Sequence, residues 1–313
     1  MPRAPRYVYL GPEGTFTETA LLQVPGAQDA ERVPMPTVGA ALDAVRAGEA
    51  DAAMVPIENS VEGGVTATLD SLATGRPLVV VREGVVPVTF VLAGRPGVAL
   101  EDVKRVASHV QGLAQCRGWV QTHLPEATMI PAMSTAAAAE GLLDPAVQYD
   151  AALCAPIAAR RHGVPVLAEG VGDNPNAVTR FVLVSRPAPP PAPSGADKTT
   201  IAAYLRDDRP GALREILEQF AVRGINLTRL ESRPTGDELG RYYMSIDAEG
   251  HVGDARLAEA LQGLHRVCAA VRFLGCYPRA DGTAPHVRPE NSEQAFTAAQ
   301  AWFDSLMAGD GSA

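Results

Sequence analysis

The tripeptide Thr179-Arg180-Phe181 stands where a turn cluster, Asn-Pro-Asn-Ala, runs into an apolar and β-branched segment. This change of composition predicts a loop that enters a buried strand. The three side chains offer a hydroxyl, a guanidinium and an aromatic ring. A guanidinium at a core strand needs an anion or water beside it, because burying the charge alone is costly. Arg180 could be a strand-end arginine whose head group reaches solvent, or a clamp for a small anion.

Four more polar loops each come between a predicted strand and a predicted helix. They span residues 11–17, 56–66, 108–111 and 133–137. Backbone N–H groups at the start of a helix favour an anion, and polar side chains at the carboxyl ends of strands fit a ligand crevice. Each loop also has an ordinary explanation as a turn or a helix cap. Together with the Arg180 segment they predict the lining of one cleft for a small anion.

Two of these loops hold further titratable side chains. Glu58 could act as a general acid if it is buried, or it could be a solvated carboxylate or a cap. Ser108 and His109 are neighbours, but no GxSxG elbow accompanies them, so they give little support for a nucleophile. Neither a GxGxxG nor a GxxxxGK[ST] motif occurs, so the sequence gives no support for a nucleotide-binding function.

The charge balance and the cysteines exclude several classes of function. The net charge of −9 provides no basic field for nucleic acid or for an anionic membrane. The four cysteines lie without CxxC spacing, and no histidine stands at metal-ligand distance from them in the sequence. We read them as small core residues in a reducing compartment, and expect no metal. The first residues lack the apolar segment of a signal peptide, so we expect a cytoplasmic protein.

The elements that must position these loops alternate up to residue 186. Expected strands cover residues 6–10, 51–57, 78–86, 88–93, 105–108, 127–130 and 151–154. Expected helices cover residues 17–24, 37–47, 65–73, 111–123, 134–143 and 156–161. Such alternation predicts parallel sheets with helices on both faces, either as one large sheet or as two lobes with a cleft.

A proline-rich segment at residues 187–195 forms a stiff spacer, and a different order of elements follows it. The expected elements are a strand at 199–205, a helix at 211–222, strands at 226–232 and 241–248, a helix at 255–264 and a strand at 270–277. This βαββαβ order predicts a ferredoxin-like unit. In the tail, a helix at 292–306 would carry an apolar stripe that docks on the body or on another subunit.

The quoted loops, in their order, resemble the prephenate dehydratase family. The resemblance rests on GPEGTFT, VPIENSVEGG, SHVQGLAQC, STAAAAE and NPNAVTRF. The later GALREILEQFAVRGINLTRLESRP resembles the family's amino-acid-binding regulatory domain, called ACT. The match spans residues 7–277, and departs from the family at Val110, where many members have proline, and at Gly112, where alanine is frequent.

The resemblance implies an α/β fold with a two-lobed catalytic domain that is similar to periplasmic binding proteins. The implied domains are a catalytic domain at 1–186, a linker at 187–197, a ferredoxin-like ACT domain at 198–279 and a tail with one helix at 280–313. It also implies a cofactor-free lyase that converts prephenate to phenylpyruvate in L-phenylalanine biosynthesis. Feedback regulation by L-phenylalanine and a homodimer or homotetramer are implied as well. The alternatives are arogenate dehydratase and a non-catalytic two-lobed ligand sensor.

The resemblance assigns roles to individual residues of this chain. Thr179 would donate a hydrogen bond to the leaving hydroxyl, Arg180 would clamp the side-chain carboxylate, and Phe181 would pack the ring pocket. The other implied substrate contacts are Thr15, Asn59, Ser108, Gln111, Ser134, Thr135 and Asn176. The implied phenylalanine site consists of Gly211, Ala212, Leu213, Asn226, Leu227, Glu231, Ser232, Arg233 and Pro234.

Overall fold

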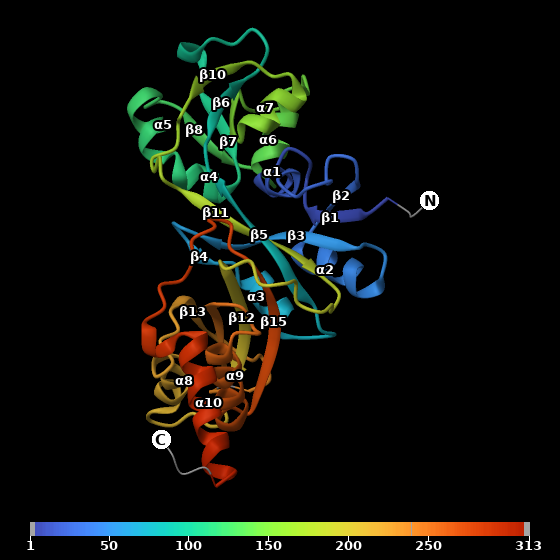
Figure 1. Cartoon of the computed structure of the whole chain (residues 1–313). Coiled ribbons are helices and arrows are strands. Elements are labelled where there is room, and N and C mark those ends of the chain that lie inside the picture. Colours follow the sequence, from blue (N-terminus) through green and yellow to red (C-terminus); the bar gives the residue numbers. More distant parts are fainter. Residues whose placement is uncertain (1–3, 239, 310–313) are drawn as a thin grey trace. The chain divides into compact units, whose positions relative to one another are not determined.

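The computed structural model describes residues 4–238 and 240–309, and the chain divides into two compact units (Figure 1). Unit 1 comprises Met1–Thr68 and Gly84–Leu183, and unit 2 comprises Leu69–Glu83 and Val184–Ala313. The units are therefore not continuous in sequence, because a segment of 15 residues (69–83) from the first half of the chain packs with the second half. No helix of the described residues is long and apolar enough to cross a membrane.

The first lobe of unit 1 is built on a sheet with the strand order β2-β1-β3-β11-β5, and the short β4 pairs with β3. Its strands are β1 (Arg6–Leu10), β2 (Glu31–Met35), β3 (Ala52–Asn59), β4 (Gly63–Gly64), β5 (Val79–Pro87) and β11 (Val178–Ser185). Its helices are α1 (Phe16–Leu22), α2 (Val38–Ala47) and the first residues of α3 (Thr66–Ala73). The rest of α3 and the first residues of β5 belong to unit 2. Threonine hydroxyls cap α1 and α2 by accepting from backbone N–H groups, so these helices begin where the sequence offers a capping side chain.

The second lobe has a sheet with the order β10-β6-β9-β7-β8. Its strands are β6 (Val91–Gly94), β7 (Arg105–Ser108), β8 (Thr128–Pro131), β9 (Ala151–Cys154) and β10 (Val166–Glu169). Its helices are the 3-10 helix η1 (Leu100–Asp102), α4 (Val110–Gln115), α5 (Arg117–His123), α6 (Thr135–Gly141) and α7 (Pro156–His162). Helices α4 and α5 cover one face of the sheet while α6 and α7 cover the other (Figure 1), with a separate hydrophobic core on each side.

Both lobes correct the expectation of purely parallel sheets. In the second lobe β7 runs parallel to β8 and β9, but β6 is antiparallel to β9 and to β10. In the first lobe a short loop joins β3 to β4, and these two strands pair antiparallel. The helix expected at 111–123 is two helices, which are interrupted at Cys116.

Unit 2 contains a four-stranded antiparallel sheet with the order β13-β14-β12-β15. Its elements are β12 (Asp197–Tyr204), α8 (Ala212–Ala221), β13 (Leu227–Pro234), β14 (Tyr242–Glu249), α9 (Ala255–Val267) and β15 (Ala270–Pro278), followed by the 3-10 helix η2 (Pro289–Asn291) and α10 (Glu293–Met307). Helices α8 and α9 cover one face of the sheet, with α10 beside α9 (Figure 1). The two α/β lobes of unit 1 and this βαββαβ order confirm the predicted fold class.

The C-terminal residues of α3 and the first residues of β5 pack against the four-stranded sheet of unit 2. A Cβ on Gly275 of β15 would lie 2.2 Å from the Val80 carbonyl oxygen of β5, so the backbones meet where only glycine fits. The buried Lys198 of β12 binds the buried carboxylate of Glu83, with Nζ–Oε2 at 2.9 Å. Asp70 of α3 accepts from Arg233 of β13 at 2.9 Å and from the Tyr243 hydroxyl at 3.0 Å. Polar pairs therefore anchor this segment within unit 2.

Candidate active site

A cavity of about 360 Å³ opens between the two lobes of unit 1. Its size lies in the range of small-molecule sites. Both lobes contribute to its wall. This agrees with the expectation that the four polar loops and the segment around Arg180 line one cleft. The residues expected at the site that line it are Thr15, Asn59, Gln111, Ser134, Thr135, Thr179 and Phe181.

The beginnings of three helices bring polar groups to this wall. Thr15 is the N-cap of α1, His109 is the N-cap of α4, and Ser134 is the N-cap of α6. The Ser134 hydroxyl caps α6 by accepting from the Ala137 N–H at 2.9 Å. The same residue also lines the cavity. The capping and the ligand-binding explanations of these loops are therefore compatible.

The Thr179 hydroxyl is held by an amide from a neighbouring strand. Asn59 Nδ2 donates to Thr179 Oγ1 at 2.9 Å. The amide orientation is fixed, because Asn59 Oδ1 accepts from the N–H groups of Val61 at 2.8 Å and Glu62 at 3.2 Å. A hydroxyl that accepts a hydrogen bond still has a proton to donate, so Thr179 can act as a donor toward a group in the cavity.

Arg180 does not line the cavity, although Thr179 and Phe181 on either side of it do. Successive side chains of a strand point to opposite faces, so residues 179 and 181 share the cavity face and Arg180 points to the other. Arg180 is 9 % exposed, and its guanidinium forms an ion pair with Glu58, with Nη1–Oε2 at 3.3 Å. The structure therefore does not place Arg180 at the cavity wall, where a direct clamp on a substrate carboxylate would need it.

Two other expected contacts also lie away from the cavity. Ser108 is fully buried, and its hydroxyl donates to the Leu153 carbonyl at 2.7 Å, which ties β7 to β9. Asn176 is exposed, and its N–H donates to Asn174 Oδ1 at 3.0 Å in a turn. Local hydrogen bonds hold both residues in the backbone framework, and the structure brings neither of them to the cavity wall.

The apolar part of the wall includes residues that sequence reasoning did not single out. Phe16 and Phe90 meet edge to face with ring centroids 5.7 Å apart, and both line the cavity. Thr17, Gln115 and Met133 line it as well. Phe16 and Thr17 belong to the GPEGTFT loop, so the polar motif of that loop already pointed to their neighbourhood. Phe90 comes from a loop between strands that carries no polar motif.

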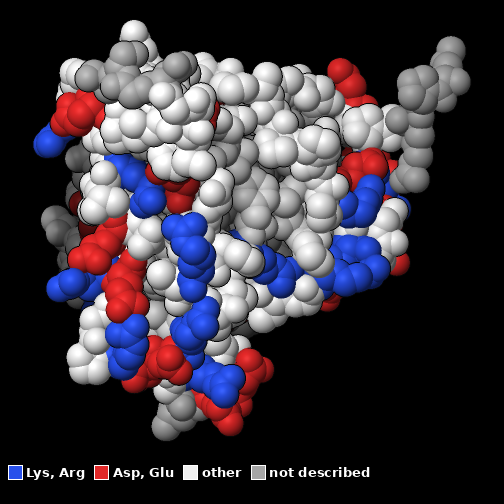
Figure 2. Space-filling model, turned by 60° about the horizontal axis from the view of Figure 1, so that its bottom comes forward, with Lys and Arg blue, Asp and Glu red and all other residues white. Residues whose placement is uncertain are grey.

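The charges of the site are arranged around the cavity, outside its wall. Among the residues that the structure describes, none that lines it is Lys, Arg, Asp or Glu. Figure 2 shows basic and acidic side chains interspersed on the face that it draws. An anion in the cavity would therefore be held by hydroxyl, amide and backbone N–H groups at short range rather than by a surface field.

Two sets of contacts link the lobes beside the cavity. Glu62, after β3, accepts from Gln111 and from Gln115 Nε2 of α4, the latter at 3.3 Å. On α7, Arg161 donates to Glu18 at 3.0 Å and also pairs with Glu13. Glu18 is 4 % exposed and accepts from the Gly14 N–H at 2.6 Å. These contacts hold the loop that carries Thr15 against the second lobe.

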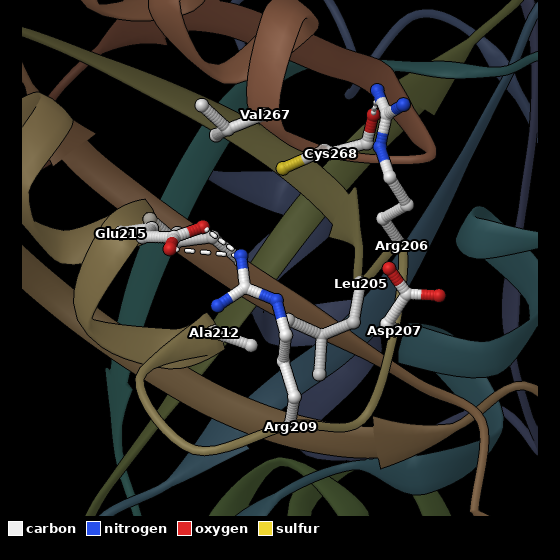
Figure 3. A pocket seen from close by; sticks show the side chains of 9 residues that line it. Leu205, Arg206, Asp207, Arg209, Ala212, Glu215, Val267 and Cys268 are labelled. Carbon is white, nitrogen blue, oxygen red and sulfur yellow. Dashed lines mark hydrogen bonds and ion pairs between the residues drawn. The ribbon is translucent and has the colours of Figure 1, made fainter.

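A second hollow, of about 500 Å³, lies in unit 2 at the start of α8. Four of the residues expected to bind an amino acid line it, namely Gly211, Ala212, Leu213 and Ser232. Gly211 adopts a left-handed conformation, with φ at 89°, which favours glycine at this helix start. Next to it, the Arg209 guanidinium and the Glu215 carboxylate form an ion pair in the lining of a smaller pocket (Figure 3), with Nη2–Oε2 at 2.7 Å.

The remaining residues of the expected amino-acid site do not line this hollow. Arg233 is bound to Asp70 at 2.9 Å, and Glu231 pairs with Arg229 at 3.3 Å. Leu227 packs on the core of unit 2. Asn226 and Pro234 are exposed. All five lie on or beside β13, an edge strand of the sheet.

The cysteines match their reading as core residues. All four are buried and unbridged. Burial raises the pKa of the Cys116 thiol to about 12, and burial likewise raises the pKa of Cys154 to about 12. Within residues 4–238 and 240–309, no group of three or more His, Cys, Asp or Glu side chains is placed to hold a metal ion.

Comparison with known proteins assigns the chain to a family. The family model for prephenate dehydratase matches residues 7–189, and that for the ACT domain matches residues 199–266. The chain belongs to the prephenate dehydratase family. The prephenate dehydratase of Mycobacterium tuberculosis is 48 % identical over 313 residues, covering 97 % of this chain and 94 % of the relative.

Solved structures of similar proteins agree with this family assignment. The prephenate dehydratase of Arthrobacter aurescens, in complex with L-Phe, is 60 % identical, with a TM-score of 0.93, and the match covers 97 % of this chain and 99 % of that one. A structure described as GqqA, a novel type of quorum quenching acylase, is 31 % identical with a TM-score of 0.77, covering 87 % of this chain and 97 % of that one. The same fold therefore occurs under a different activity.

Proposed function

We propose that this chain catalyses the conversion of prephenate to phenylpyruvate, carbon dioxide and water. The single observation that carries the proposal is the Thr179 hydroxyl, oriented by Asn59 at the wall of the cavity between the lobes. In this reaction the bond to the ring carboxylate breaks and its electrons move into the ring. Hydroxide then leaves from the opposite end of the ring and takes up one proton to become water. Aromatisation drives the collapse, so the departure of hydroxide is the step that needs help.

Thr179 is suited to assist that departure. A threonine hydroxyl is a weak acid, so it stabilises the negative charge that develops on the leaving oxygen or relays a proton from water. The hydrogen bond from Asn59 at 2.9 Å fixes the Thr179 oxygen and makes its O–H a better donor. Donors that are oriented before the reaction act at the moment when charge develops, which is how they lower the barrier.

The rest of the wall binds and orients the substrate. Phe181 is 2 % exposed, and with Phe16 and Phe90 it forms an apolar surface for the ring. The hydroxyls and N–H groups at Thr15, Ser134 and Thr135 suit carboxylate oxygens. Because none of the described lining residues is acidic, nothing at the wall would neutralise an ammonium group. This supports the keto acid prephenate over the amino acid arogenate as substrate.

The deciding experiment measures phenylpyruvate release by the purified protein from prephenate and from arogenate. We expect turnover on prephenate, and we expect Thr179→Ala to lower kcat by about 100-fold, equivalent to about 2.7 kcal/mol of barrier. Thr179→Ser is the matched control, since it keeps the hydroxyl. A folded Thr179→Ala protein with near-native turnover would contradict the role of this hydroxyl, and absence of any turnover by the native protein would leave the ligand-sensor alternative.

Regulation by phenylalanine is part of the proposal. L-phenylalanine would bind between the ACT domains of two chains in a homodimer or homotetramer. It would contact the hollow lined by Gly211, Ala212, Leu213 and Ser232, together with exposed positions of the edge strand β13. Phenylalanine can inhibit only if it binds the less active arrangement more tightly than the active one. Activity and sedimentation measured with and without saturating phenylalanine test this. If neither changes, the regulatory proposal fails.

A further inference from the structure

Strands β3 and β11 contact each other side by side at three successive pairs. The Ser60 N–H donates to the Val178 carbonyl at 2.9 Å, Asn59 Nδ2 donates to Thr179 Oγ1 at 2.9 Å, and Arg180 Nη1 lies 3.3 Å from Glu58 Oε2. As the residue number falls from 60 to 58 on one strand, it rises from 178 to 180 on the other. The ion pair is thus the next cross-strand pair after the one that orients the proposed donor.

The ion pair lies away from the cavity. Neither Glu58 nor Arg180 lines it, whereas Asn59 and Thr179 both do. The alternation of side chains along a strand places Arg180 on the opposite face from Thr179 and Phe181. With 9 % of its surface exposed, Arg180 could reach a ligand in the cavity only if the strand turned over, which would remove Thr179 from the wall.

We infer that Glu58 and Arg180 are positioning residues for the proposed reaction and that Arg180 does not bind the substrate carboxylate. Their ion pair fixes the register of β3 against β11, and thereby holds the Asn59 amide opposite the Thr179 hydroxyl. Loss of the pair lets this hydroxyl move relative to the leaving oxygen. The inference rests on the proposed function, because it assigns the pair a role in that reaction.

The geometry gives a kinetic signature that separates positioning from direct binding. A positioning pair acts on the reaction step, so its loss lowers kcat; a displacement of about 1 Å can cost on the order of 100-fold. A carboxylate clamp acts on binding, so its loss raises KM and weakens the binding of phenylpyruvate, which keeps the side-chain carboxylate of the substrate. Glu58 is the more telling position, because an anion has no direct use in binding an anionic substrate.

The test compares Arg180→Gln, Glu58→Gln, the double variant and Arg180→Lys, with Arg82→Gln as a control for the loss of an exposed cation on the adjacent strand β5. The measurements are kcat and KM for prephenate, Kd for phenylpyruvate by calorimetry, and Tm. We expect each of the two single neutralising variants to lower kcat by about 10-fold or more while KM and Kd stay within about 5-fold. The kcat of the double variant should be no lower than that of the less active single variant, because the two side chains act as one unit.

Two results would overturn the inference. One is a rise of KM or Kd beyond about 5-fold in Arg180→Gln, which would restore the clamp. The other is an unchanged kcat per folded molecule in Glu58→Gln, even if its Tm falls. If Arg180→Gln does not fold, Glu58→Gln and Arg180→Lys decide by the same criteria. Turnover by the native protein tests the proposed function separately, so the two failures can be told apart.

Discussion

At the scale of the residue, the chemistry of Thr179 depends on the amide that faces it. Asn59 offers Nδ2 to the hydroxyl only because its Oδ1 is engaged by two backbone N–H groups. A carboxylate of the same size would keep the contacts to those N–H groups. Its second oxygen would then accept the Thr179 proton, which would no longer be available to the leaving group.

We therefore expect Asn59→Asp to lower kcat by about 100-fold or more, the range seen when one donor to a developing oxyanion is removed. Steady-state kinetics with prephenate, together with Tm, check this. Asn176→Asp is the matched control, since this asparagine is exposed and does not line the cavity. Equal kinetics for the two variants would contradict the role given to Asn59.

The buried thiols give a prediction that depends on pH. Folding raises the pKa of the Cys116 and Cys154 thiols from 9.0 to about 12 and that of Cys268 to about 11, in each case mainly by burial. Between these values the unfolded chain loses protons that the native protein keeps, so the free energy of unfolding must fall as the pH rises above 9. Below pH 9 these groups make no difference between the two states.

Two measurements check this sign. Urea unfolding at a series of pH values should show stability declining from pH 9 upward, with tyrosines such as Tyr243, whose pKa burial also raises, acting in the same direction. A thiol reagent at pH 8 should leave the native protein unlabelled and should modify four thiols once urea unfolds it. Rapid labelling of native protein would contradict the buried placement of the cysteines.

At the scale of the element, the loop before α1 is fixed by charge as well as by backbone shape. Gly14 has φ at 80°, and a Cβ on it would lie 3.2 Å from the Ala158 Cα of α7. Glu18, buried beneath the loop, accepts from the Gly14 N–H and from Arg161. The loop carries Thr15 to the cavity wall, so this set of contacts decides where one of the polar groups stands.

We expect Arg161→Gln to destabilise the protein by about 2 kcal/mol, the cost of losing a hydrogen bond to a charged group. The value stays below the 3–5 kcal/mol typical of a broken buried ion pair, because the Arg161 side chain is 37 % exposed. KM for prephenate should rise as the loop loosens. Arg160→Gln is the control, since Arg160 is the exposed neighbour on α7. Equal urea midpoints for the two variants would contradict this.

The sequence predicts most elements because their hydrophobic periodicity is strong and their ends carry caps. Strands β7 and β9 occupy the predicted residues, and α2 and α3 begin one residue after the predicted start. Strand β2 was missed because Glu31–Met35 has no alternation and contains proline, as an edge strand can. The break at Cys116 follows from tertiary packing of a fully buried residue, which periodicity does not reveal.

The site was predictable as a set of loops, but less so as a set of side chains. The motifs locate the strand ends, and those ends meet at one cavity. Ser108 lies off the cavity wall, because its hydroxyl donates to a carbonyl 45 residues away, which no local pattern shows. The direction of Arg180, by contrast, could have been inferred, because strand alternation alone separates it from Thr179 and Phe181.

At the scale of the whole molecule, helix α3 belongs to both compact units, since Thr68 falls in unit 1 and Leu69 in unit 2. In unit 1 the Thr68 hydroxyl donates to the Pro56 carbonyl at 2.6 Å, just before Glu58 and Asn59. In unit 2, two residues further along the helix, Asp70 binds Arg233 and Tyr243. Arg233 stands on β13, among the residues expected to meet phenylalanine. The same helix therefore contacts the loop before the donor-orienting Asn59 in unit 1 and the proposed effector strand in unit 2.

If phenylalanine acts through this helix, Asp70→Asn should weaken inhibition without touching the chemistry. We expect the phenylalanine concentration for half inhibition to rise by about 5-fold, within the usual range of coupling between sites, while kcat without phenylalanine stays near the native value. Asp237→Asn is the control, an exposed carboxylate after β13 in the same unit. Calorimetry separates the two ways of losing inhibition: coupling is lost when phenylalanine still binds but no longer inhibits, whereas a weaker Kd alone would mean that Asp70 shapes the binding site. Unchanged inhibition in Asp70→Asn would exclude the Asp70 contacts from the route.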